Sequence, residues 1–330
     1  MASSAPGLGW GVVGTGQISQ FMSSDLQNVP GARLRAVASR STSRASAFAA
    51  EHGFETEYGS LEALLDDESI DIVYIATPHS THAQYAIAAL AKRKHVLIEK
   101  PMAVDAQEAA SIQVAAHEAG CFAMEAMWMR FNPVYRLMLS DLAEGVIGAP
   151  ATLRASFGLP FGQPESTRWA AALRSSTLLD QAIYPVTLAR DVFGAPESIF
   201  GSARIRDDGV DLSVELTMLY ASGEYAHLDA SMISYIDPTA SISGTGGWIT
   251  ANPPFWGMSS YRRHLGDIPT ALFSSDEVSL PAEGFGYVPM LEAVQEAVVA
   301  GQLEHPWHTL ADAVEIMSLL DRARSVVVRR

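Results

Sequence analysis

The stretch GVVGTGQIS, residues 11–19, decides the fold of this chain. It places a glycine-rich turn between an apolar run at 8–13 and a helical pattern at 17–27. Gly14 allows a tight turn and Gly16 lets the backbone approach a phosphate closely, while the free N–H groups that begin the helix attract negative charge. Such a turn between a strand and a helix is typical of a parallel sheet that binds a dinucleotide pyrophosphate.

The next apolar run, 33–38, ends about 20 positions after the glycines, where this fold places its ribose-binding side chain. No Asp or Glu occurs between Asp25 and Glu51. An acidic residue there would bond the ribose 2′-hydroxyl and repel a 2′-phosphate, so its absence favours NADP over NAD. Arginine can bind that phosphate or stack on adenine, although an arbitrary arginine is more often a solvated surface residue. The candidate residues for the phosphate are Ser39, Arg40 and Arg44.

Length, composition and charge narrow the class of protein. A chain of 330 residues exceeds what one core usually serves, and 48% hydrophobic with 18% charged residues describes a compact globular protein. The net charge of −15 argues against nucleic acid or an anionic membrane as partner. The uncharged segment 238–261 is interrupted by prolines and glycines, so we expect no membrane helix, and the short polar N-terminus leaves no room for a signal peptide. The single cysteine, Cys121, suits a reducing cytoplasm.

Strand and helix patterns alternate through the first 125 residues. Apolar runs of the buried-strand type occur at 71–76 and 95–99, with a helical pattern at 80–91 between them. This alternation implies right-handed crossovers and an α/β fold with a doubly wound parallel sheet. We therefore assign residues 1–125 to a dinucleotide-binding Rossmann domain.

The pattern changes after about residue 145. A helix at 178–193 comes first, and the turns Asp207-Asp208-Gly209 and Ser222-Gly223 indicate hairpins between later strands. We expect residues 126–330 to form an α+β domain whose open, largely antiparallel sheet serves substrate binding and a homodimer interface. Closing helices near 283–301 and 309–328 would cover this sheet or pack on the first domain. The expected strands are 198–206, 211–220, 225–236, 239–243 and 246–251.

Chemically active side chains follow two of the first domain's strands. Glu99-Lys100-Pro101 ends one strand and Thr77-Pro78-His79 ends the strand before it, so both share the sheet edge where ligands bind. An ammonium group there could lower the barrier to losing an alcohol proton while a hydride leaves the carbon. The simpler interpretation of Lys100 is a solvated residue before a turn-forming proline.

Asp180 and Tyr184 are four positions apart, which would place them on one face of a helix that could meet Lys100. A nearby ammonium favours the tyrosine anion, so Tyr184 could give and take a proton near neutral pH. The alternative is a half-buried tyrosine bonded to a structural aspartate. We expect no metal site, because His79 and His82 lack an accompanying cysteine or carboxylate ligand pattern.

Together these motifs resemble, over nearly the whole chain, the glucose–fructose oxidoreductase, inositol dehydrogenase and rhizopine-catabolism (Gfo/Idh/MocA) family of NAD(P)-dependent oxidoreductases. The segment MEAMWMRFNP, residues 124–133, is similar to the branch that contains dimeric dihydrodiol dehydrogenase and NADP-dependent D-xylose dehydrogenase. The resemblance implies that Lys100, Asp180 and Tyr184 form the catalytic cluster, with Tyr184 as acid and base. It also implies that Trp128 and Arg130 line the cofactor cleft. The other expected cofactor-binding residues are Gly14, Thr15, Gly16, Gln17, Ile18, Ser39, Arg40, Arg44, Thr77, Pro78, His79, His82, Glu99 and Lys100.

One segment departs from that family. Relatives usually carry a glycine triplet and an alanine where this chain has Arg174-Ser175-Ser176-Thr177, and Ala182 replaces a glycine before Tyr184. Side chains at these positions reduce the room for backbone approach and add hydrogen-bond donors. We expect an NADP-dependent oxidoreductase that moves a hydride between nicotinamide and a secondary alcohol or ketone. The expected substrate is a small polyhydroxylated molecule, either sugar-like or a diol. The alternative is a catalytically silent NAD(P)-binding regulatory or scaffold protein of the same fold.

Overall fold

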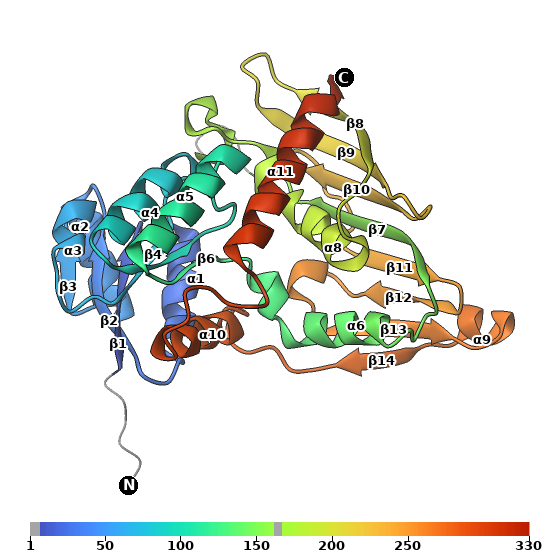
Figure 1. Cartoon of the computed structure of the whole chain (residues 1–330), viewed down its shortest axis with the longest axis horizontal. Coiled ribbons are helices and arrows are strands. Elements are labelled where there is room, and N and C mark those ends of the chain that lie inside the picture. The colour runs from blue at the N-terminus through green and yellow to red at the C-terminus, as the bar shows by residue number, and fades with distance from the viewer. Residues whose placement is uncertain (1–6, 162–166, 330) are drawn as a thin grey trace, which may run out of the picture. The chain divides into compact units, whose positions relative to one another are not determined.

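The computed structural model describes residues 7–161 and 167–329, and these form two compact units (Figure 1). The first unit contains the described residues up to Trp128 together with Ala282–Glu315. The second contains Met129–Pro281 and the described residues from Ile316 onward. The segment 282–315, which the sequence-based division places in the second domain, thus belongs to the first unit.

The first unit is built on six strands in the order β3-β2-β1-β4-β5-β6, and every neighbouring pair is parallel. This confirms the predicted doubly wound sheet. The central strands are buried on both faces, which is why they appear in the sequence as continuous apolar runs. The strands are β1 (Leu8–Val13), β2 (Ala32–Ala38), β3 (Thr56–Tyr58), β4 (Ile72–Ile75), β5 (His95–Ile98) and β6 (Ala123–Glu125).

Helices cover both faces of this sheet. The chain leaves β1 in one direction to β2 and β3 and in the other to β4, β5 and β6, so right-handed crossovers place the two sets of helices on opposite faces. On one face, α4 and α5 lie side by side (Figure 1). The helices are α1 (Gln17–Leu26), α2 (Thr42–His52), α3 (Leu61–Leu65), the 3₁₀ turn η1 (His79–Thr81), α4 (His82–Ala91) and α5 (Ala106–Ala119).

The late segment completes the first unit. Helix α10 (Val288–Val299) packs beside α1. Of the two placements expected for this helix, it thus takes the one on the first domain. The buried Asp25 carboxylate accepts hydrogen bonds from the backbone N–H groups of Phe285, at 2.9 and 3.0 Å, and Tyr287, at 2.8 Å. This carboxylate therefore fixes the segment before α10 to the end of α1.

The second unit is built on a sheet in the order β14-β13-β12-β11-β7-β10-β9-β8-β15. Only the β7–β10 and β8–β15 pairs are parallel, which confirms a largely antiparallel sheet. The predicted turns at Gly209 and Gly223 form hairpins, and both glycines have positive φ. The strands are β7 (Pro150–Gly158), β8 (Ser198–Ile205), β9 (Asp211–Leu219), β10 (Tyr225–Ser231), β11 (Ala240–Gly244), β12 (Gly247–Ala251), β13 (Ser260–Leu265), β14 (Asp276–Ser279) and β15 (Val328–Arg329).

One face of this sheet carries helices and the other keeps alternate residues exposed. Helices α7 and α8 contact β9, β10 and β7, while Glu215, His227 and Asp229 point away from that core and remain exposed. The helices and 3₁₀ turns outside the parallel sheet are η2 (Trp128–Phe131), α6 (Pro133–Ala143), η3 (Thr167–Trp169), η4 (Ala171–Leu173), α7 (Thr177–Asp180), α8 (Ile183–Phe193), η5 (Phe255–Gly257), α9 (Ile268–Phe273) and α11 (Leu310–Val326).

The predicted single helix at 178–193 is wrong, because the structure has two helices with a break at Gln181 and Ala182. Pro185 explains the break. Its ring nitrogen cannot donate to the carbonyl of Gln181, and its ring would collide with that carbonyl in a continuous helix. Proline is tolerated in the first turn of α8, where no such bond is needed.

Six strands also differ from expectation: β10 is shorter, and β3, β7, β13, β14 and β15 were not expected. Strand β10 ends at Ser231 rather than 236, because the Ser231 hydroxyl accepts from the N–H groups of Ile233 and Ser234 and turns the chain. Strand β7, not predicted, lies between β11 and β10.

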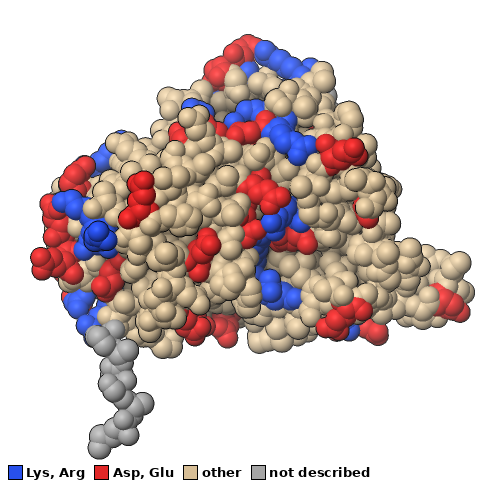
Figure 2. Space-filling view, in the orientation of Figure 1, with Lys and Arg blue, Asp and Glu red and all other residues tan. Residues whose placement is uncertain are grey.

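Within the described residues no helix is long and apolar enough to cross a bilayer. On the face seen in Figure 2, Lys and Arg form small groups separated by acidic and other residues.

Candidate active site

The glycine turn at the end of β1 has the geometry that a pyrophosphate site needs. Gly14 has φ +109°, and a Cβ there would lie 2.4 Å from the Ala76 carbonyl oxygen, so only glycine fits. A Cβ at Gly16, in contrast, would meet no atom within 4 Å. Helix α1 begins at Gln17, and no side chain caps its N-terminus. Thr15 lies in the turn before the helix, and Ile18 is the second residue of the helix. The open space and the uncapped N–H groups fit a bound pyrophosphate.

Ser39, Arg40 and Arg44 surround the beginning of α2. Ser39 is half-buried after β2, while both arginines are exposed and, among the described residues, form no ion pair. The N-cap residue Ser41 accepts from the Arg44 N–H at 3.4 Å. The structure thus brings two cations and a helix N-terminus to the end of the strand that follows the glycine turn, as a 2′-phosphate site requires.

The loop after β4 is held by His82. This imidazole is 1% exposed, with Nδ1 2.9 Å from the Pro101 carbonyl oxygen and Nε2 2.8 Å from that of Thr77. Burial lowers the pKa of His82 to about 4, although both carbonyl contacts favour the charged form. A neutral ring has one N–H and donates to one carbonyl at a time. His82 therefore links the loop of Thr77, Pro78 and His79 to the loop that follows β5.

Lys100 follows β5 and is half-buried. Its backbone N–H donates to Glu99 Oε2 at 3.1 Å, and the Tyr74 hydroxyl donates to Glu99 Oε1 at 2.5 Å. Burial raises the pKa of Glu99 to about 7, against the opposing effects of the Tyr74 bond and the Lys100 charge. The glycine turn, Thr77 and Lys100 therefore follow the carboxyl ends of the adjacent strands β1, β4 and β5.

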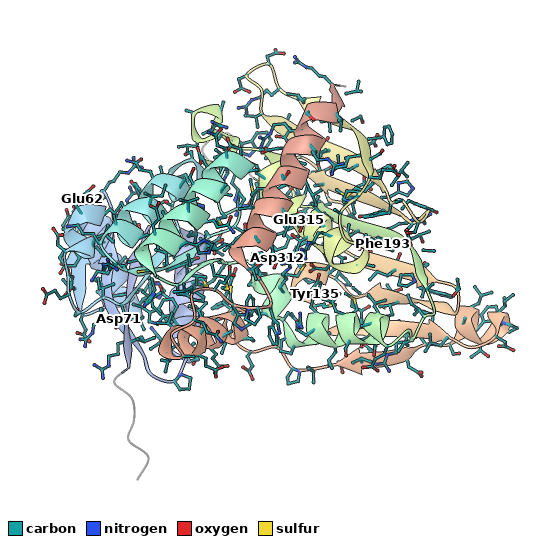
Figure 3. All side chains as sticks on the ribbon, in the orientation of Figure 1. Glu62, Asp71, Tyr135, Phe193, Asp312 and Glu315 are labelled. Carbon is teal, nitrogen blue, oxygen red and sulfur yellow. The ribbon has the colours of Figure 1, made fainter. Side chains whose placement is uncertain are left out.

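Trp128 and Arg130 belong to one 3₁₀ turn but to different units. In the first unit the centres of the Trp128 and Tyr287 rings lie 5.0 Å apart. In the second, the buried Arg130 guanidinium forms an ion pair with Asp191, which also accepts from the Tyr135 hydroxyl at 2.7 Å. Tyr135 is labelled near the start of α6 in Figure 3, and burial raises its pKa. Arg130 thus links η2 and α6 to α8, and its predicted place in the cofactor cleft stays a prediction.

Tyr184 is packed among aromatic rings of the second unit. Its ring is 5.6 Å from that of Phe157 and 5.8 Å from that of Trp256, and these two rings stack at 3.6 Å. Tyr184 itself is 4% exposed. Packing against these two rings fixes the position of the Tyr184 ring.

Asp180 and Tyr184 do not share a helix face, contrary to the sequence prediction, because α7 ends at Asp180 and α8 begins afterwards. The Asp180 carboxylate instead forms an ion pair with Arg168, whose guanidinium lies 4.1 Å from the centre of the Phe161 ring. The sequence offered no signal for this partner, since the pair joins a 3₁₀ turn to a separate helix.

Arg174, Ser175 and Ser176 line a cavity of about 280 Å³ in the second unit. Arg174 has φ +61°, a conformation that favours glycine, and Ser175 and Ser176 are buried. The Asp211 carboxylate closes the start of α7 by accepting from the Leu178 N–H at 2.7 Å. Burial raises the pKa of Asp211. The serines therefore form a packed helix start.

Lys100 lies in the first unit, and Asp180 and Tyr184 lie in the second. Their assembly into one catalytic cluster is part of the proposal below.

Comparisons with known proteins agree with these motifs. The model described as an oxidoreductase family with an NAD-binding Rossmann fold matches residues 8–127, and the GFO/IDH/MocA C-terminal domain matches residues 135–250. Trans-1,2-dihydrobenzene-1,2-diol dehydrogenase of Sus scrofa is 33% identical over 337 residues, covering 97% of both chains. The Homo sapiens protein of that name is 32% identical over 336 residues, again covering 97% of both.

Solved structures share the fold over the whole chain. KijD10, a 3-ketoreductase from Actinomadura kijaniata in complex with NADP and TDP-benzene, has a TM-score of 0.89 at 27% identity and covers 98% of both chains. Levoglucosan dehydrogenase, in complex with NADH and levoglucosan, has a TM-score of 0.87 at 22% identity over 97% of both chains, which shows the fold alone. The family predicted from the motifs is confirmed: the chain belongs to the GFO/IDH/MocA family and is an NAD(P)-dependent oxidoreductase acting on CH–OH groups.

Proposed function

We propose that this oxidoreductase uses NADP to interconvert a secondary alcohol and a ketone on a sugar-like or diol substrate. The observation that carries the proposal is the alignment of three features at the carboxyl ends of β1, β4 and β5, which are neighbours in the sheet. These features are the open glycine turn, the Thr77 loop and Lys100. Ligands of open α/β sheets bind in the crevice at such a switch point.

The residues have separate roles in this proposal. The glycine turn and the N-terminus of α1 would hold the pyrophosphate, while Ser39, Arg40 and Arg44 would hold the 2′-phosphate. The cofactor, when bound, would supply the hydride chemistry, with NADP⁺ as acceptor in the oxidation and NADPH as donor in the reduction. Tyr184 gives or takes the proton of the reacting oxygen, and the Lys100 ammonium stabilises the tyrosine anion and the developing alkoxide. Asp180 orients the cluster from the end of α7.

The substrate class follows from the second unit's side chains. Phe157 and Trp256 offer a flat apolar wall beside Tyr184, and Asp180 with Arg168 offers donors and acceptors for several hydroxyl groups. This combination suits a small polyhydroxylated ring. We further propose a homodimer through the exposed face of the second unit's sheet, and a cytoplasmic location, which accords with a single free cysteine, Cys121.

A substrate screen tests the proposed function directly. The purified protein is mixed with NADP and with sugars, cyclic polyols or trans-diols, or with NADPH and keto-sugars, while the nicotinamide absorbance is followed. We expect turnover with members of these classes and with NADP better than with NAD. Tight NADP binding without turnover on any of them would favour the silent regulatory alternative.

Replacing Gly16 by valine should abolish cofactor binding without unfolding the protein. The added methyl groups enter space that is open in the structure and that the pyrophosphate needs. Calorimetric titration with NADP measures the affinity, and thermal unfolding checks the fold. Gly14→Val serves as the contrasting variant, because its Cβ would collide with the Ala76 carbonyl and should destabilise the protein itself. Unchanged NADP affinity in folded Gly16→Val would show that the phosphate binds elsewhere.

Removing the Arg40 guanidinium should weaken NADP binding roughly tenfold or more, because a charge-assisted contact to the 2′-phosphate is lost. NAD lacks that phosphate, so its Kd should change little. Both affinities can be measured by titration on Arg40→Ala, with Arg33→Ala, which removes an exposed arginine of β2, as control. An equal loss for the two cofactors contradicts the assignment.

Tyr184→Phe keeps the ring in its aromatic wall and removes the exchangeable proton. We expect kcat to fall by about 10²- to 10⁴-fold with little change in NADP affinity, since that is the usual contribution of a positioned proton donor. The kcat of Lys100→Met should fall by a comparable factor. The kcat of the double variant should fall by much less than the product of the two single factors, because the effects of groups that act as a unit are not additive.

The matched control for these variants is Tyr235→Phe, whose side chain is 81% exposed and should leave kcat unchanged. Near wild-type kcat in Tyr184→Phe would remove Tyr184 from the catalytic cluster.

A further inference from the structure

The loop that carries Lys100 is held by side chains that are themselves buried. The Lys100 N–H donates to Glu99 Oε2 at 3.1 Å, and the Pro101 carbonyl oxygen lies 2.9 Å from His82 Nδ1. The Met102 N–H donates to Glu125 Oε1 at 2.7 Å. Three consecutive residues thus have a backbone polar group in contact with a buried side chain, and these side chains come from the loop itself, from α4 and from β6.

Glu125, the last residue of β6, has a second partner. Its Oε2 atom lies 2.8 Å from His308 Nε2, and the two side chains are 1% and 0% exposed. His308 belongs to the segment 282–315 that returns to the first unit. A turn positions it there, because the His308 N–H donates to the His305 carbonyl at 3.0 Å and the Leu310 N–H donates to Glu304 at 2.9 Å.

We infer that the buried Glu125–His308 pair is a positioning device for Lys100. A carboxylate removed from water must be satisfied by donors inside the protein, and here one oxygen is satisfied by His308 and the other by Met102. If the imidazole donor is lost, the carboxylate is left partly unsatisfied and must rotate, take up a proton or admit water. Each of these responses disturbs the bond to Met102.

Met102 is two residues from Lys100, so its displacement reaches the lysine through a short, tightly held loop. Catalytic groups must be held within about 0.5 Å of their productive position, and an error of about 1 Å can cost 10²-fold in rate. This inference rests on the proposed function, in which Lys100 acts on the reacting oxygen. It adds that residues outside the crevice, one of them about 200 positions later in the chain, set the position of that lysine.

Three variants test the pair. His308→Leu removes the donor, His308→Gln keeps an N–H that can reach Glu125 Oε2, and Glu125→Leu/His308→Leu removes both polar groups. We expect His308→Leu to lower kcat roughly 10- to 100-fold, with NADP Kd within about threefold of wild type. His308→Gln should keep kcat within about threefold, because it retains the hydrogen bond.

The double variant separates positioning from mere stability. Replacing both members of a buried pair by apolar residues leaves no lone buried charge, so its thermal stability should exceed that of His308→Leu. Its kcat should nevertheless stay low, because the Met102 N–H has lost its acceptor. If His308→Leu fails to fold, the double variant and His308→Gln carry the test by themselves.

Asp141→Asn is the matched control. The buried Asp141 carboxylate accepts from the Tyr261 hydroxyl and pairs with Arg263 at 2.6 Å, within the second unit. Its replacement should lower stability without lowering kcat.

A double variant that regains kcat together with stability would overturn the inference, and so would a folded His308→Leu with wild-type kcat. Lys100→Met distinguishes this failure from failure of the proposed function. If Lys100→Met is inactive while the pair variants are fully active, only the positioning role falls. If Lys100→Met keeps full activity, Lys100 has no catalytic role, and the proposed function is contradicted at this residue.

Discussion

The handedness of the crossovers in the first unit is the constraint on which the site depends. Because each parallel connection is right-handed, the chain can leave β1 in two directions only by placing its helices on opposite faces. The carboxyl ends of β1 and β4 are then adjacent with no helix crossing between them. Gly14 shows how tight this junction is, since a side chain there would occupy the space of the Ala76 carbonyl. The glycine turn is therefore required by the packing of the sheet as well as by the phosphate.

Sequence patterns predicted the first unit well because its signals are local. Strands such as β4 (Ile72–Ile75) are buried along their whole length, so hydrophobicity alone marks them. The second unit was harder. Strand β7, Pro150–Gly158, contains proline, alanine and glycine, which are depleted from strands, and its place between β10 and β11 comes from pairing with distant segments. The break before α8 was visible in Pro185, but the apolar periodicity on either side concealed it.

The same distinction separates the site residues that could be predicted from those that could not. Gly14, Gly16 and Lys100 lie within three residues of a strand end, so strand position and residue type were enough to propose them from the sequence. The partner of Asp180, Arg168, was not predictable, because the ion pair joins two separate elements, η3 and α7. Beside Arg168, the Trp169 indole N–H donates to the Phe161 carbonyl at 3.2 Å, and the Trp169 ring lies in a small apolar cluster with Met232.

The return of residues 282–315 to the first unit shows why a contiguous division of the chain was inadequate. Two buried carboxylates of the first unit hold this segment, one through its backbone and the other through a side chain. Asp25 receives the N–H groups of Phe285 and Tyr287, and Glu125 receives His308. Both carboxylates would be costly if left unpaired, since burial removes their water. The first unit therefore reaches its complete form only after Met129–Pro281 of the second unit has been synthesised. Glu125, which accepts from Met102 in the Lys100 loop, depends on His308, a residue that follows this insertion.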